Sequence, residues 1–386
     1  MRNKLGLGEI CTTIALGILT GVCGSASAKP APLGKPLPPE FQRIVCVGDS
    51  ITDGDSYPLL IRQSLVEAGY QAPTMICAGV ASDIAAQMHA RLDRDVFPYH
   101  PTLVTFHAGA NDAGHGVTAE MFRAELTAVA ERMKQTGIPM ILMTPAIRSP
   151  EKFEAVEPIL LQYCQVVHDV AKQYDLKVAE AHQGMLDARA KGENPIETDT
   201  IHPNYRGHQI MARSILDAMG FADVPLPKEL KPDMLPGVIT DWMIRVKPPK
   251  NPALDETTVL TVKPDNTWTH YTLPDKDPLD NWWLNQERQR GFALALDKLV
   301  GKGSVYQGVT VIKSRKSRQV WFNTGSGLTE LWVNGKALYD NPGMKVWTGW
   351  HAGKERIPYQ LHRGDNTVVI ESSNQFFLSM TDNNDW

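Results

Sequence analysis

One serine and one Asp-x-x-His pair have positions that suit nucleophilic chemistry. Ser50 stands in the run Gly48-Asp49-Ser50, directly after a short apolar segment, and Asp199 and His202 follow about 150 residues later. A serine hydroxyl barely ionises at neutral pH, so it needs a base within hydrogen-bond reach, and that imidazole needs a carboxylate to fix its tautomer. These residues are therefore a candidate nucleophile, base and orienting acid.

Each motif also has a simpler interpretation. A turn that only caps a helix would carry the same Gly-Asp-Ser tripeptide. A lone Asp-x-x-His pair is compatible with a turn aspartate and a surface imidazole. Together the two motifs favour the chemical interpretation, because the first supplies a nucleophile and the second supplies the base and carboxylate that it needs.

A third motif, Gly109-Ala110-Asn111-Asp112, follows the apolar run 102–108. Acyl transfer builds negative charge on a carbonyl oxygen, and a fixed donor near that charge stabilises the transition state. The Asn111 side-chain amide and the Ser50 backbone N–H are suitable donors. The alternative is that Asn111 and Asp112 only form a turn. His107 and His115 flank this loop and are candidates for lining a pocket.

The motifs lie between alternating apolar and amphipathic segments, which are the predicted strands and helices that would position them. The clearest helical pattern spans 118–135, with Thr118 as a possible cap and Gly137 after its end. Between such patterns lie short runs apolar enough to be covered on both faces, which predicts a parallel sheet with helices on each side. The predicted strands are 43–47, 74–78, 102–108, 140–144 and 177–179.

The chain changes character after residue 240. All nine tryptophans lie beyond that point. Short segments rich in β-branched and aromatic residues alternate there with turn residues, and Asn334-Gly335 is a strong hairpin signal. We therefore expect an antiparallel β-sandwich over 250–386, joined to a catalytic domain over 42–222 by a proline-rich linker, 223–249.

The N-terminus is typical of an exported protein. Residues 1–28 have a basic start, a short apolar run and a small-residue cleavage site near Ala28, which predicts a signal peptide and a secreted or periplasmic location, with no membrane span in the mature chain. Residues 29–41 form a proline-rich leader. The three cysteines after the signal, Cys46, Cys77 and Cys164, lie in apolar stretches and are expected to be free thiols. The net charge of −4 does not indicate the basic surface that nucleic-acid binding requires.

The three motifs, in their order and spacing, resemble the motif blocks of the SGNH hydrolase family, also called GDSL-type esterases. The resemblance implies a flavodoxin-like, three-layer α/β/α fold with a parallel sheet. It also implies Ser50 as nucleophile, His202 as base, Asp199 as its orienting acid, and an oxyanion hole made by the Ser50 amide, Asn111 and a backbone amide of a second block. No metal or organic cofactor is implied.

That second block departs from the family pattern. The family usually shows Asn-x-x-x-x-Gly-Asp, whereas this chain reads Cys77-Ala78-Gly79-Val80-Ala81-Ser82-Asp83. The motif glycine aligns with Ser82, and Gly79 lies three residues earlier. Either backbone amide is a candidate for the oxyanion hole.

The tryptophan-rich half resembles, more loosely, galactose-binding-like β-sandwiches that accompany polysaccharide-acting enzymes. Trp347, Trp350 and the pair Trp282-Trp283 lie in polar, turn-rich surroundings and are candidates for stacking on sugar rings. Alternatively, this half only stabilises or covers the first.

The first hypothesis is therefore a secreted esterase that removes acetyl or similar groups from an acylated carbohydrate. A second keeps the chemistry but changes the substrate, as in lipases, lysophospholipases and thioesterases. A third is a carbohydrate-binding protein whose hydrolase domain is inactive.

Overall fold

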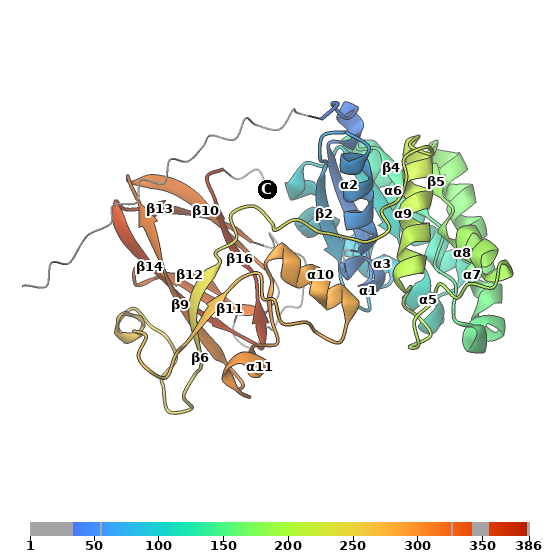
Figure 1. Ribbon diagram of the computed structural model, residues 1–386. Coiled ribbons are helices and arrows are strands. Elements are labelled where there is room, and N and C mark those ends of the chain that lie inside the picture. Colours follow the sequence, from blue (N-terminus) through green and yellow to red (C-terminus); the bar gives the residue numbers. More distant parts are fainter. Residues whose placement is uncertain (1–33, 55, 326, 342–354, 384–386) are drawn as a thin grey trace, which may run out of the picture. The chain divides into compact units, whose positions relative to one another are not determined.

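The computed structural model describes residues 34–54, 56–325, 327–341 and 355–383 (Figure 1). The predicted signal peptide and Trp347 and Trp350 lie outside these residues. Within them, no helix combines the length and the apolar character that crossing a bilayer requires.

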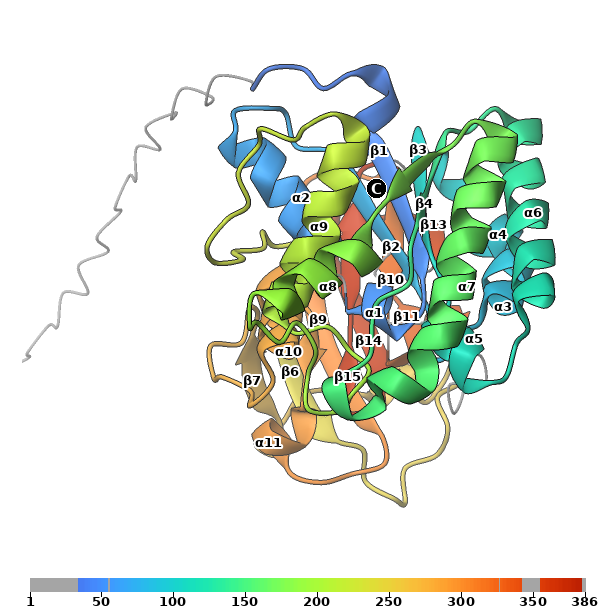
Figure 2. The same ribbon diagram turned by 90° about the vertical axis from the view of Figure 1, so that its right-hand side faces the viewer.

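A five-stranded parallel sheet forms the centre of the first half, with strand order β2-β1-β3-β4-β5 (Figure 2). This order is that of flavodoxin-like folds, so the predicted fold class is confirmed. Each observed strand lies within two residues of its predicted bounds. The strands are β1 (Arg43–Gly48), β2 (Thr74–Gly79), β3 (Leu103–His107), β4 (Met140–Met143) and β5 (Lys177–Ala179).

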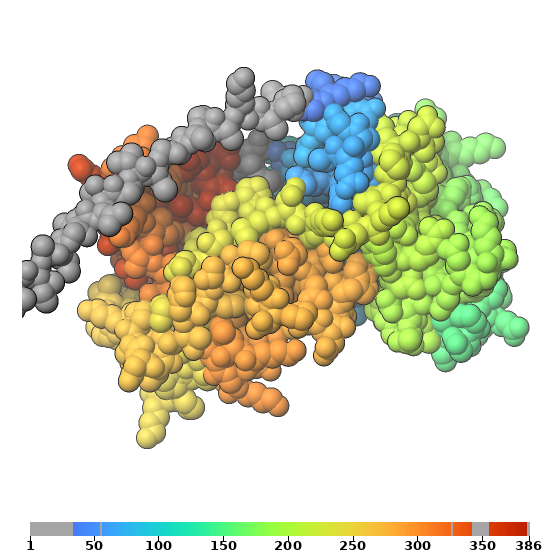
Figure 3. All heavy atoms as spheres, in the orientation of Figure 1, coloured from blue at the N-terminus to red at the C-terminus, as the bar shows by residue number. Residues whose placement is uncertain are grey.

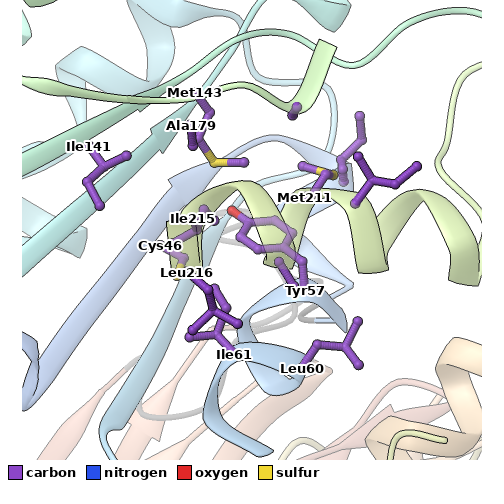
Figure 4. Packing of buried hydrophobic residues seen from close by; sticks show 14 of the residues in the cluster. Cys46, Tyr57, Leu60, Ile61, Ile141, Met143, Ala179, Met211, Ile215 and Leu216 are labelled. Carbon is purple, nitrogen blue, oxygen red and sulfur yellow. The ribbon is translucent and has the colours of Figure 1, made fainter. Parts of the chain in front are cut away.

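Side chains of β1 alternate between two hydrophobic layers, as the pleat of a strand requires. Ile44 and Cys46 pack in a cluster with residues of α2 (Ser56–Glu67) and α9 (Tyr205–Met219) (Figure 4). Val45 and Val47 pack on the opposite face with residues of α6 (Ala119–Thr136) and α7 (Pro150–Tyr174). Both faces of the sheet are therefore covered by helices.

Helix α6 illustrates how local sequence sets these boundaries. The Thr118 hydroxyl caps its start by accepting from Met121 N, and Gly137 ends it with φ of 70°, a conformation that glycine adopts without steric cost. The remaining helices of this half are η1 (Pro39–Phe41), α1 (Ser50–Asp53), α3 (Ala85–Ala90), α4 (Leu92–Asp95), η2 (Phe97–Tyr99), α5 (Ala110–Gly114) and α8 (Ala181–Ala190).

The two larger sheets of the second half are antiparallel and share one core. The six-stranded sheet has the order β12-β11-β14-β9-β6-β7, and the three-stranded sheet has the order β13-β10-β16. Trp242 and Leu331 of the first sheet and Phe322 and Leu378 of the second belong to one buried cluster, so the predicted sandwich is confirmed. Its longer strands are β6 (Asp241–Val246), β7 (Thr269–Thr272), β9 (Tyr306–Ser314), β10 (Arg318–Thr324), β11 (Leu328–Val333), β12 (Lys336–Asp340), β13 (Arg356–Leu361), β14 (Gly364–Ser372) and β16 (Leu378–Thr381).

The hairpin prediction also holds. Asn334 and Gly335 form the two-residue loop between β11 and β12, with φ of 51° and 82°, as tight hairpin turns require. Two short strand segments, β8 (Ala293–Leu294) and β15 (Gln375–Phe376), pair with each other. The helical elements of this half, which the sequence did not predict, are η3 (Val259–Thr261), α10 (Trp282–Arg290) and α11 (Leu296–Val300).

Two predicted boundaries differ from the structure. The range 223–249, predicted as linker, contains β6, which pairs with β7 and β9, so the sandwich begins earlier than its prolines suggested. The predicted leader 29–41 also contributes to the first domain: Lys35 bridges to Tyr70, and Leu37 and Phe41 are buried in its core. A proline lacks only its own backbone N–H. The residues between the prolines can therefore still pair in a sheet and pack into a core.

Candidate active site

Ser50 begins α1 at the carboxyl end of β1, where the strand passes directly into the helix. Asp49 caps this helix by accepting from Ile51 N at 2.9 Å. The helix lies close over the strand ends: a Cβ at Gly48 would stand 2.0 Å from Thr52 Oγ1, and one at Gly79 would stand 2.1 Å from Asp53 N. Glycine at both positions therefore permits the approach that fixes Ser50 at the sheet edge.

The loop before α9 holds the acid and the base. Asp199 Oδ1 accepts from the backbone N–H groups of Ile201 and His202, each at 2.9 Å. These bonds orient the carboxylate so that its Oδ2 lies 2.6 Å from His202 Nδ1. The loop is anchored by a bond from Glu197 N to His202 O at 2.7 Å, and Asn204 caps α9.

The structure brings the serine, imidazole and carboxylate together. Ser50 Oγ lies 2.7 Å from His202 Nε2 across 152 residues of sequence, and His202 Nδ1 contacts Asp199 on its other side. The side chains of His202 and Asp199 are 40% and 51% exposed, so the imidazole is open to solvent and to a substrate. The arrangement can move a proton from the hydroxyl to the imidazole while the carboxylate holds the tautomer.

The two candidate oxyanion groups lie at the neighbouring strand ends. Asn111 Nδ2 donates to Asp83 O at 3.0 Å and approaches Asp49 Oδ2 at 3.4 Å, which places this side chain between the loops after β1 and β2. Ser82 is exposed and has φ of 71°, a conformation that favours glycine. A glycine, which the family pattern has at this position, would adopt the conformation without strain.

Gly79 differs from Ser82 in its surroundings. It is buried, belongs to β2, and lies under the backbone of α1. The Ser82 amide is in the exposed turn that follows. The structure therefore favours Ser82 over Gly79 as the source of a backbone donor, although neither Ser82 nor Asn111 lines the pocket described next.

A pocket of about 520 Å³ opens at Ser50 and His202, a volume typical of small-molecule sites. The described residues that line it include four carboxylates and no lysine or arginine, so the pocket disfavours anionic groups. Its lining residues are Ser50, Ile51, Asp53, Gly54, Ser56, Ala81, Glu197, Thr198, Asp199, His202, Pro203, His208, Asp280, Asn281, Trp282 and Trp283.

Two histidines do not lie where the sequence suggested. His107 and His115 were candidates for lining the pocket, but neither does so. His107 is fully buried at the end of β3, with Asp49 Oδ1 3.9 Å from its Nδ1, and His115 contacts Asn111 O. His208, on the first turn of α9, lines the pocket instead. Its position four residues after Asn204, the α9 cap, was a signal that could have identified it.

Sequence reasoning also missed Arg91, which joins the loops beneath the site. Its guanidinium, 7% exposed, donates to the carbonyl oxygens of Gly48 and Ala78 at the ends of β1 and β2, and to the carboxylates of Asp83 and Asp95. The i,i+4 spacing of Arg91 and Asp95 was the available signal. These bonds hold in place the turn that contains Ser82 and the Asp83 carbonyl oxygen that accepts from Asn111 Nδ2.

Burial dominates the electrostatics next to the serine. Burial raises the pKa of Asp49 to about 6, although the Ile51 N–H and the positive charges of His202 and Arg148 oppose the shift. Burial lowers the pKa of His107 to about 4 and that of His208 to about 3. Burial alone would raise the pKa of Asp199, but hydrogen bonds from His202 and Ile201 lower it, so this carboxylate is ionised at neutral pH.

Comparisons with known proteins find a family and a relative with similar sequences. A sequence profile of the GDSL-like lipase/acylhydrolase family matches residues 46–210. An acetylxylan esterase of Geobacillus stearothermophilus is 23% identical over 215 residues, which are 47% of this chain and 94% of that protein.

Two solved structures are also similar. An α/β hydrolase from the metagenome of Lake Arreo, Spain, has 24% identity and a TM-score of 0.43, covering 47% of this chain and 96% of its own. A structure of the acetylxylan esterase of Geobacillus stearothermophilus has 21% identity and a TM-score of 0.44, covering 50% of this chain and 98% of its own.

The chain is a carboxylic ester hydrolase. Residues 46–210 match the GDSL-like lipase/acylhydrolase family, the SGNH hydrolases, which confirms the family that the motifs indicated. The likeness of the sandwich to galactose-binding domains stays a prediction.

Replacing Arg91 by methionine should lower the free energy of unfolding by about 3 kcal/mol, because the Asp83 carboxylate would lose its buried partner. Urea denaturation would measure the change. The matched control is Arg132→Ala, which breaks an exposed pair with Asp93 and should cost less than about 1 kcal/mol. Equal effects of the two substitutions would contradict the role of the buried network.

The buried His107 should make stability depend on pH. The folded protein keeps this ring neutral down to about pH 4, whereas the unfolded chain takes up a proton near pH 6.5. Acidification from pH 7 to 5 therefore favours the unfolded state. The protein should lose about 2 kcal/mol more over this range than a His107→Leu variant.

Urea unfolding at both pH values would test this expectation. Substitution of the exposed His362 by leucine serves as the control and should leave the pH dependence unchanged. A His107→Leu variant with the same pH dependence as the unaltered protein would show that another group is responsible. The raised pKa of Asp49 acts in the opposite direction between about pH 6 and 4, and it is present in all three proteins.

Proposed function

We propose that this esterase removes acetyl or similarly small acyl groups from a carbohydrate, with Ser50 as nucleophile, His202 as general base and acid, and Asp199 as the group that orients His202. The observation that carries the proposal is the continuous contact from Ser50 Oγ through His202 to Asp199, at 2.7 and 2.6 Å, inside a pocket.

In the proposed reaction, Ser50 Oγ attacks the ester carbonyl and its proton passes to His202 Nε2. The tetrahedral intermediate collapses when His202 returns this proton to the sugar oxygen, which leaves as an alcohol. Water, deprotonated by His202, then attacks the acyl-serine, and the second intermediate releases the carboxylic acid and restores Ser50.

The negative oxygen of each intermediate needs donors at the sheet edge. The Ser50 backbone N–H, the Ser82 backbone N–H and Asn111 Nδ2 are the proposed ones. Asn111 Nδ2 carries two hydrogens: one is committed to Asp83 O, and the other has only the 3.4 Å contact with Asp49. That second hydrogen is the one available to an oxyanion.

The pocket lining supports a polar, uncharged substrate. Glu197 and Asp280 offer acceptors for sugar hydroxyls, and five residues supply apolar side chains: Ile51, Ala81, Pro203, Trp282 and Trp283. A long acyl chain would require a continuous apolar groove. A thioester that carries phosphate groups would be repelled by the four carboxylates of the pocket. The similarity to an acetylxylan esterase supports the same choice. Export through an N-terminal signal is part of the proposal and rests on the sequence.

Replacing Ser50 by alanine should reduce acetate release from acetylated xylan by at least ~10³-fold, because the acyl-enzyme cannot form. The assay is enzymatic detection of free acetate. Ser214→Ala is the matched control: this serine lies on α9 and donates only to Met211 O, so the variant should retain full activity. Retention of more than a hundredth of the activity by Ser50→Ala would refute the mechanism, and binding of xylan without any hydrolysis would support an inactive carbohydrate-binding protein.

Two of the three proposed donors, Asn111 Nδ2 and the Ser82 N–H, should respond differently to substitution. Asn111→Ala should lower kcat by ~10²-fold or more with little change in KM, because the amide acts mainly in the transition state. Ser82→Gly should retain kcat, since the backbone N–H persists and glycine accepts φ of 71°. Steady-state kinetics on an acetyl ester would measure both. A large loss of kcat in Ser82→Gly would instead assign a role to the Ser82 hydroxyl.

A further inference from the structure

We propose that His208 is a substrate-binding residue whose imidazole forms a hydrogen bond with a free sugar hydroxyl on the carbon next to the one that carries the ester. The inference rests on the proposed function, because the carbohydrate part of that substrate supplies the hydroxyl. It assigns a role to a histidine of the pocket that the proposed reaction does not use.

His208 borders the same space as the reacting groups. It lines the pocket together with Ser50 and His202. The residue lies on the first turn of α9, where its backbone N–H donates to Asn204 O at 2.9 Å, and Asn204 caps the helix directly after the loop that holds His202. A substrate whose ester carbonyl is at Ser50 therefore extends into a pocket that His208 also lines.

Two aromatic contacts hold the His208 ring in place before a substrate binds. The ring stacks on Tyr57, with centroids 6.4 Å apart and planes at 16°, and the buried Tyr57 is held by a 2.9 Å hydrogen bond between its hydroxyl and Thr52 Oγ1. Trp282 of α10 meets the His208 ring edge-on, at 5.9 Å and 67°. In Figure 3 the orange surface around α10 meets the yellow-green surface of the segment that leads into α9. A ring that is already oriented lowers the entropic cost of binding.

The ring nitrogens of His208 have no hydrogen-bond partner in the protein. The residue is only 6% exposed, and its Nδ1 is buried without a partner among the described residues. No described residue makes a hydrogen bond with its Nε2 either. Buried polar groups in folded proteins nearly always have a partner, so an imidazole without one calls for an explanation. A ligand that enters the pocket supplies the missing partner.

The charge state of His208 suits a hydroxyl. Burial, with smaller contributions from the neighbouring His202 and His107, lowers the pKa of His208 to about 3, so the ring is neutral at pH 7. A neutral imidazole has one donor N–H and one acceptor nitrogen. A hydroxyl both donates and accepts, so it can pair with either tautomer. Because Nδ1 is the buried nitrogen, Nε2 is the atom assigned to the hydroxyl.

An acylated sugar presents such a hydroxyl close to the reacting carbonyl. The ring carbons beside the one that carries the ester normally bear hydroxyls. An acetyl group fills only a small part of the pocket volume of about 520 Å³, so the sugar accounts for the remaining space. With the acyl carbon at Ser50, the hydroxyl beside the ester is the sugar group assigned to His208.

The test compares a methyl xyloside that carries one acetyl group with its deoxy analogue, in which hydrogen replaces the hydroxyls beside the ester. The unaltered enzyme should have a kcat/KM about tenfold higher for the hydroxyl-bearing ester, mainly through KM, because the deoxy ester leaves His208 without a partner. His208→Phe should reduce this ratio to about twofold or less, since phenylalanine keeps an aromatic ring but has no nitrogen. His208→Gln should retain part of the preference because its amide can replace Nε2. Acid release in a pH-stat would measure both reactions.

His168→Phe is the matched control, since this histidine lies on α7, pairs with Glu180 at 3.5 Å, and is not among the described residues that line the pocket. Its kcat/KM ratio should equal that of the unaltered protein. Thermal unfolding of each variant would identify any loss of fold. Equal hydrolysis of the two esters by the unaltered enzyme, or an undiminished preference in a folded His208→Phe, would overturn the inference while leaving the proposed function intact. Failure of the unaltered enzyme to release acetate from any acetylated sugar would overturn both.

Discussion

The contact between Ser50 and His202 depends on the packing of α9 against the sheet. Residues of α9 share one buried cluster with β1 and α2, and the His202 loop immediately precedes this helix. If α9 shifted along the sheet, the 2.7 Å separation of Ser50 Oγ and His202 Nε2 would be lost first, because hydrogen bonds tolerate only a few tenths of an ångström. The apolar face of α9 therefore determines whether the imidazole of His202, 152 residues from the serine, can act as a base.

Much of this arrangement follows from sequence because its signals are local. Strands 43–47 and 177–179 are short apolar runs, and α6 carries its own cap and stop residue, so periodicity and capping suffice to place them. The positions of Ser50 and Asn111 followed from a simple rule: the carboxyl ends of parallel strands share one edge of the sheet. The motif spacing then indicated the family.

Other features depend on contacts between distant residues and leave weak local traces. Arg91 looks like an ordinary helical arginine, and only the folded chain shows that it is buried and bonds four partners from three segments. Trp282 and Trp283 were noted for possible exposure, but nothing in the sequence connected them with His208. His107 was a candidate for the pocket because it adjoins the Asn111 loop, whereas every residue of β3, His107 included, is buried.

The early start of the sandwich has a practical consequence for dividing this chain. Leu230 is buried in the core of the first half, and Val238 already bridges to Ser379 in the second, so fewer than ten residues separate the two cores. A polypeptide cut at residue 250 would lose β6 from between β7 and β9. Two rows of unsatisfied backbone groups would then face solvent, and such edges recruit strands from other molecules. Aggregation of a separately expressed sandwich would thus reflect a misplaced cut and would reveal nothing about its intrinsic stability.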